Sequence, residues 1–182
     1  LTDEAHRHGL MVCAHLTYSA DYAQAARCGV DSVHHAAFDG VITDRVADEL
    51  IEAGVVFVPT LSLASLLIDG MQHRWCDDPQ FTAGLPPALV RNMREFTTHY
   101  EQCPPDEPVP GFFVSLPKRE WEAVPENQLR NVAKYVERGG TIALGTDSAL
   151  GFSLHGTPVR EMELMVEAGL NIVEAIQAAG QN

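Results

Sequence analysis

Three histidines and one aspartate stand at, or just beyond, the ends of short apolar segments of this sequence: His15, His34, His35 and Asp147. A carboxylate next to a buried strand is costly unless it is paired or binds a cation. Imidazole and carboxylate groups are also the common protein ligands of zinc and related metals. These residue types therefore predict a metal site, in which Asp147 would also accept a proton from a metal-activated water.

Each of these residues also has an ordinary structural interpretation. His15 is compatible with a hydrogen-bonded histidine at a strand end, and Asp147 with a turn or helix-capping aspartate. His34 and His35 are neighbours, and neighbouring strand residues point to opposite faces, so we expect only one of them to face the interior. Alternation does not decide which one. His155, on the following loop, is a candidate substrate contact or a solvated histidine.

A repeated unit positions these side chains: a helix-like stretch, a glycine, a short apolar strand and then a polar residue. The four copies contain strands expected at 10–14, 31–33, 55–58 and 141–144. The glycines stand where a helix needs a left-handed residue to end before a strand. Helices alternating with buried strands predict an α/β fold with a parallel sheet, whose chemistry gathers at the carboxyl ends of the strands.

Four such units amount to about half of a (β/α)8 barrel. We therefore expect residues 1–182 to be part of a larger barrel domain. The regular spacing breaks between 61 and 124, a long insertion that holds most of the prolines and contains helices expected at 62–68 and 87–100. Long loops on the catalytic face of a barrel form substrate walls, and peripheral decoration is the alternative. A helix expected from about residue 126 restores the regular order.

The amino-acid composition limits the classes of binding partner to expect. The formal net charge of −13 argues against binding to nucleic acid, and no apolar run is long enough to span a bilayer. The four cysteines include no C-x-x-C pair, so we expect reduced cysteines and a cytoplasmic location. The expected partner is a small-molecule substrate, and the sequence leaves open whether the protein forms a homo-oligomer.

The chain resembles the C-terminal half of the amidohydrolase superfamily, in the branch of imidazolonepropionase and the prolidase-like dipeptidases. Three parts of the sequence carry the resemblance and together cover nearly all of it outside the insertion. They are VCAH at 12–15 with AARCGVDSVHH at 25–35, LIEAGVVFVPTL at 50–61, and ALGTD at 143–147 with HG at 155–156 and EMELMVEAGL at 161–170. The last of these is the most specific.

The resemblance implies a TIM-type barrel, with this chain supplying roughly strands five to eight, and a metal-dependent hydrolase that cleaves a carbon–nitrogen bond in an amide or cyclic amide. It implies that His15, His35 and Asp147 bind the metal and that Asp147 shuttles the proton. It also selects His35, not His34, as the metal ligand of this pair. His34 occupies a position where this branch often has glutamate.

Other parts of the family's site have no counterpart in this sequence. These are the His-x-His pair of the first strand and the lysine or glutamate of the fourth, so this chain holds at most three ligands. Zinc is the default metal, and one or two ions remain open. Two alternatives also stay open: a non-catalytic barrel module with an incomplete metal site, and a barrel enzyme whose histidines act as acid and base without metal.

The two outer predicted strands, 10–14 and 141–144, would have unpaired backbone edges that the rest of a barrel covers. Exposed apolar edges of parallel strands favour association. We therefore expect the isolated 182-residue chain to be poorly soluble or self-associated, and to lack hydrolase activity. Sedimentation and turnover measurements test this expectation, and a monodisperse, active monomer would contradict the partial-barrel interpretation.

Overall fold

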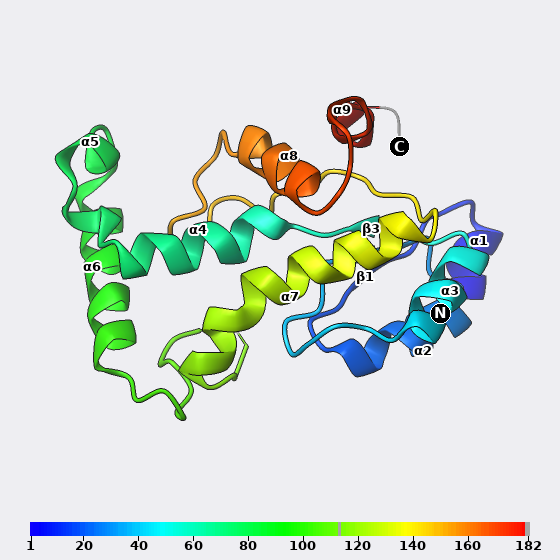
Figure 1. Cartoon of the computed structure of the whole chain (residues 1–182), viewed down its shortest axis with the longest axis horizontal. Helices are drawn as coiled ribbons and strands as arrows, with labels where there is room; N and C mark the ends of the chain where they lie inside the picture. The colour runs from blue at the N-terminus through cyan, green and yellow to red at the C-terminus, as the bar shows by residue number, and fades with distance from the viewer. Residues whose placement is uncertain (113, 181–182) are drawn as a thin grey trace.

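Short apolar segments of the chain pair as parallel strands, and helices pack around them to give an α/β structure (Figure 1). The computed structural model describes residues 1–112 and 114–180, so residue 113 of the insertion and the last two residues, 181–182, lie outside it. The elements are α1 (Thr2–Arg7), β1 (Cys13–His15), η1 (Ser19–Asp21), α2 (Tyr22–Arg27), β2 (Ser32–His34), α3 (Asp44–Glu52), β3 (Val56–Val58), α4 (Leu61–Gln72), η2 (Trp75–Asp77), α5 (Pro79–Thr82), α6 (Pro87–Gln102), α7 (Lys118–Glu137), α8 (Pro158–Glu167) and α9 (Ile172–Gly180).

The sheet has the order β1-β2-β3, with every pair parallel. The fourth expected strand, 141–144, lies beside β3 but is reduced to one parallel bridge between Ile142 and Phe57. Ala143 N–H donates to the Phe57 carbonyl at 2.9 Å, whereas Leu144 N–H donates to Ala178 of α9. The expected strand is therefore shorter than predicted, because α9 takes over the backbone bonding where the pairing with β3 ends.

The local signals at helix ends are confirmed. Thr43 caps α3, with its hydroxyl accepting from Val46 N–H at 3.3 Å. Gly29 and Gly54 each have φ of 71°, the left-handed geometry that ends a helix before the next strand. The first strand is displaced from the prediction, because His15 lies inside β1 while Leu10 and Met11 are exposed and outside it.

The buried apolar side chains form two clusters. The first surrounds the sheet and includes Val33, Phe57 and Tyr135. The second lies mainly in the predicted insertion and includes Met71 and Trp121. In Figure 1, α5 and α6 stand at the end of the molecule away from the sheet, while α4 and α7 lie between the two ends. The insertion therefore has a hydrophobic core of its own, and α4 contributes side chains to both clusters.

The start of the helix after the insertion was predicted wrongly. The helix expected from residue 126 begins at Lys118 and passes through Pro125. Proline removes one backbone N–H and usually marks a helix start or break, which is why the sequence suggested a later beginning. Trp121 and Val124 are fully buried one turn before Pro125, and their packing holds the additional turns of α7 in place.

Polar side chains of α7 hold the loop that follows β2. The buried Asn131 side chain accepts from Ile42 N–H at 2.8 Å and donates to the Gly40 carbonyl at 2.9 Å. Gln128 donates to the Ala36 carbonyl at 3.1 Å. These bonds satisfy backbone groups that the loop cannot pair by itself, so α7 determines the path of the chain just after His35.

None of the helices in the described ranges combines the length and apolar character of a membrane span.

Replacing Asn131 by alanine should lower the free energy of unfolding by about 2–3 kcal/mol, because buried N–H and C=O groups of the loop lose their partners. Urea denaturation measures this change. Asn127→Ala on the same helix is the control, since Asn127 donates one long bond of 3.4 Å to Phe38. Equal, small losses in both variants would show that the loop does not depend on Asn131.

Candidate functional site

The predicted site residues line a cavity at the carboxyl ends of the strands. It measures about 630 Å³ and is lined by Cys13, His15, His34, His35, Val58, Thr60, Leu144, Gly145 and Asp147. A second cavity of about 580 Å³ shares His15 and Asp147 with the first. The structure therefore brings together side chains that are more than 100 positions apart in the sequence, as expected for the ends of parallel strands.

His15 and His35 are in direct contact. His35 Nε2 lies 2.9 Å from His15 Nδ1, and the two rings meet edge to face with centroids 4.5 Å apart. Two imidazole nitrogens on one tetrahedral zinc ion lie about 3.3 Å apart, given Zn–N bonds of about 2.0–2.1 Å. The two nitrogens therefore fit a metal ion as a pair of ligands after a small separation.

His35 is held on several sides. Its Nδ1 lies 2.7 Å from Thr60 Oγ1, and its carbonyl accepts from the Tyr22 hydroxyl at 2.8 Å. Burial, and to a lesser degree His15, lowers the pKa of His35 to about 4. Its imidazole is therefore neutral at neutral pH and keeps a lone pair for a metal, while Nδ1–H can donate to Thr60.

The expectation that only one of the adjacent histidines faces the interior is wrong. His34 and His35 both line the larger cavity, and His34 Nε2 lies 3.1 Å from Ser32 Oγ. His35 stands beyond the last residue of β2 with φ of 70°. This left-handed turn ends the strand alternation, so neighbouring side chains reach the same space. Burial also lowers the pKa of His34.

Asp147 lies near the histidines but not in contact with them. Its Oδ2 is 4.0 Å from His35 Nε2, and about half of its side chain (52%) is exposed. Across residues 1–112 and 114–180, no three histidine, cysteine or acidic side chains are close enough together to hold a metal ion as they stand. The donor set of two imidazoles and a carboxylate suits zinc, but Asp147 has to swing toward the histidines to complete it.

His155 is separate from this group. It is exposed on the loop before α8 and lines neither of the two cavities. The structure therefore brings together His15, His34, His35 and Asp147 and leaves out the predicted substrate contact.

Two residues that support the site were missed by the sequence analysis. Thr60, with φ of 53°, directly precedes α4 and holds His35. Glu161 of α8 is fully buried, and its carboxylate accepts from Leu61 N–H at 2.8 Å and Ser62 N–H at 2.6 Å. Glu161 thus ties α8 to the first turn of α4, beside Thr60. A charged residue on the apolar face of a helix was the available signal.

Burial raises the pKa of Glu161 to about 7, against the lowering effect of its hydrogen bonds from the first turn of α4. An acid whose pKa is raised in the folded state stabilises the fold at pH values below its ordinary pKa of about 4.5. The protein loses that contribution as the pH rises through 7. In the wild type, the free energy of unfolding should therefore fall by at most about 3 kcal/mol between pH 4.5 and 7. In Glu161→Gln, whose side chain cannot ionise, this fall should be absent.

Urea denaturation at several pH values measures this difference. Glu163→Gln is the control, because Glu163 lies on the same helix with an exposed side chain. Stability curves of wild type and Glu161→Gln that run parallel across this pH range would contradict the assignment.

Comparisons with known proteins agree with this geometry. Among solved structures, a Xaa-Pro dipeptidase with bound methionine in its active site is 25% identical, with a TM-score of 0.62 over 97% of this chain. An amidohydrolase is 24% identical with a TM-score of 0.62, and A. niger ochratoxinase is 22% identical with a TM-score of 0.62, each over 98% of this chain. The latter two likenesses show the fold.

This chain spans only about a third of these proteins: 34% of the dipeptidase, 33% of the amidohydrolase and 30% of the ochratoxinase. A search of curated protein sequences found no match. The model of the amidohydrolase family, however, matches residues 1–182. Together with the paired histidines at the ends of parallel strands, this match shows that the chain belongs to the amidohydrolase family.

Proposed function

We propose that this chain is the C-terminal part of a metal-dependent hydrolase that cleaves a carbon–nitrogen bond in an amide or cyclic amide. The observation that carries the proposal is the His15–His35 pair, 2.9 Å apart in one cavity with Asp147. Membership in the amidohydrolase family and the likeness to a Xaa-Pro dipeptidase support the class of bond.

The proposal includes the place of each strand in a (β/α)8 barrel. β1, β2, β3 and the segment around Ile142 would be strands five to eight, which their parallel order supports. The edge of β1 would then pair with a fourth strand, and the remaining metal ligands would come from the other strands of the barrel. The insertion, 61–124, would form a wall of the substrate cavity, because Val114 and Ser115 line the same cavity as Asp147.

In this proposal His15 and His35 hold a divalent metal ion, with zinc as the first choice and one or two ions open. Such an ion supplies polarisation of the scissile carbonyl and acidification of a water molecule. Thr60 keeps the His35 ring in orientation through Nδ1, which leaves Nε2 free to bind. The oxygen of water adds to the carbonyl carbon, the carbon–nitrogen bond breaks, and Asp147 carries the water's proton to the leaving nitrogen.

The pKa of His35 bears on the metal-free alternative. An acid–base catalyst works best when its pKa lies near the working pH. Burial lowers the pKa of His35 to about 4, so at neutral pH this residue is not in the cationic form that acts as a general acid. A neutral, oriented imidazole is instead the form that binds metal. This favours ligation over metal-free catalysis for His35.

Asp147→Asn in the intact enzyme should reduce turnover by at least about a hundredfold, because the amide keeps the shape but loses the basicity of the carboxylate. The loss should appear in kcat rather than mainly in KM, since the proton transfer belongs to the transition state. Steady-state kinetics with an amide substrate measures it. Near-full turnover of this variant would overturn the mechanism.

The histidines provide the matched comparison. His15→Asn and His35→Asn should lower both the metal content and the rate, as measured by elemental analysis after equal metal loading. His34→Asn should change neither strongly, although His34 lines the same cavity. Loss of metal from His34→Asn, with full retention in His35→Asn, would reverse the assignment of the ligand. Full metal content and full activity in all three variants would show that none of these histidines is a ligand and would overturn the proposed site.

A further inference from the structure

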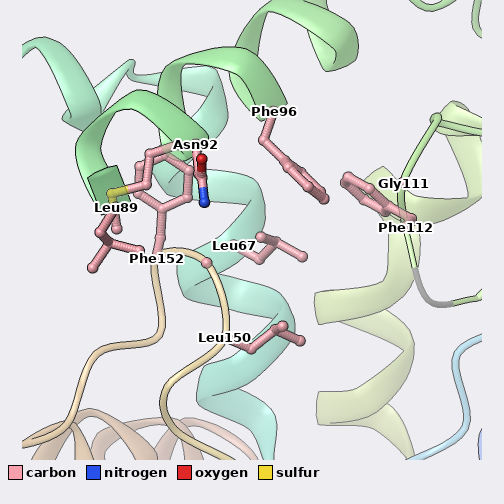
Figure 2. A pocket seen from close by; sticks show the side chains of 10 residues that line it. Leu67, Leu89, Asn92, Phe96, Gly111, Phe112, Leu150 and Phe152 are labelled. Atoms are coloured by element: carbon pink, nitrogen blue, oxygen red, sulfur yellow. The ribbon is translucent and has the colours of Figure 1, made fainter. Parts of the chain in front are cut away.

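An apolar pocket of about 250 Å³ lies between the insertion and the loop that follows Asp147 (Figure 2). Its walls come from α4, α6, the segment at 111–112 and the loop that follows Asp147. The side chains that shape it are Leu67, Leu89, Phe96, Phe112, Leu150 and Phe152. Asn92 is the only polar side chain among its described lining residues, and none of them is charged. The lining therefore suits an uncharged, apolar group.

Aromatic rings face this space from two sides. Phe96 and Phe112 stack with centroids 5.7 Å apart and an angle of 19° between their planes. Phe152 stands on the other side in Figure 2. Its ring centroid lies 5.9 Å from that of Phe81 and 6.3 Å from that of Trp75. Gly111 packs closely on the Phe96 ring, because an added Cβ would lie 3.3 Å from it. The walls are thus braced from behind, while the space between them is unfilled.

The pocket is large compared with the voids of a protein interior, and part of its lining, including Asn92 and Leu150, is exposed to solvent. Protein interiors are close-packed, and voids larger than a water molecule are few. A dry apolar cavity of about 150 Å³ is enough to bind benzene. At about 250 Å³, this pocket has room for a benzyl, indolyl or branched aliphatic group.

Leu150 connects the pocket to the candidate site. It lines both the apolar pocket and the 580 Å³ cavity that contains His15 and Asp147. It also stands three residues after Asp147 on the same loop. The apolar pocket and the cavity that contains Asp147 therefore adjoin at Leu150.

We propose that this pocket receives an aromatic or branched aliphatic side chain of the substrate and so selects amides that carry one. This inference rests on the proposed amide hydrolysis and adds the class of substrate. Recognition is by apolar contact between the side chain and the rings of Phe96, Phe112 and Phe152. The uncharged lining excludes acidic and basic side chains, which would lose their hydration without gaining a partner.

The decisive variant is Leu89→Trp in the intact enzyme, which fills the pocket from α6. We expect kcat/KM for an amide with a benzyl side chain to fall at least about tenfold, while a methyl analogue is hydrolysed as before. Two pairs of benzyl and methyl substrates are compared. One pair carries the variable side chain on the acyl side of the scissile bond, and the other carries it on the amine side. Val90→Trp is the matched control, because Val90 is the next residue of α6 and does not line the pocket. It should leave the ratio unchanged.

Binding of toluene, measured by ligand-observed NMR, tests the pocket without any hydrolysis. Wild type and Val90→Trp should bind toluene, and Leu89→Trp should not. If wild type hydrolyses no amide but shows this binding pattern, the proposed function fails and the apolar pocket stands. Equal toluene binding by Leu89→Trp and wild type, or an unchanged benzyl-to-methyl ratio, would overturn the substrate assignment. A packing gap with no role in substrate selection would appear as loss of toluene binding in Leu89→Trp with an unchanged benzyl-to-methyl ratio.

Discussion

The candidate site depends on keeping the His35 imidazole buried, neutral and fixed in orientation. The residue is only 5% exposed, and Thr60 contacts Nδ1 at 2.7 Å. Thr60 is held in turn because Glu161 accepts two backbone N–H groups from the first turn of α4. A chain of short bonds thus runs from α8 through α4 to the ring. Burial alone would leave a neutral histidine free to turn, and these bonds determine which nitrogen faces the cavity.

The same arrangement connects the insertion to the chemistry. α4 begins at the residue after Thr60, contributes Leu61 to the core around the sheet, and then contributes Leu67 to the core of the insertion. The loop after Asp147 returns to this second core through Phe152. Substrate selection in the apolar pocket and catalysis at Asp147 would therefore share one loop. Loops placed by a rigid scaffold commonly carry function in this way.

Much of the fold was predictable because its signals are local. Glycines such as Gly54 with left-handed φ, and the cap at Thr43, act within a few residues of the chain. The parallel order of the strands followed from their alternation with helices. The start of α7 was missed because buried packing around Trp121 outweighs the local signal of Pro125. The fourth strand proved short because α9, far along the chain, takes the Leu144 N–H.

The sequence by itself determined the residue types at the strand ends, and therefore that His15, Asp147 and one of the adjacent histidines would lie in one cavity. Only the tertiary structure decided how they meet. A positive φ at His35 brings His34 to the same space, which no alternation rule predicts. The supports at Thr60 and Glu161 and the pocket near Leu150 also depend on segments far apart in sequence. Local patterns specify which groups a strand end presents, whereas their orientation and surroundings arise from long-range packing.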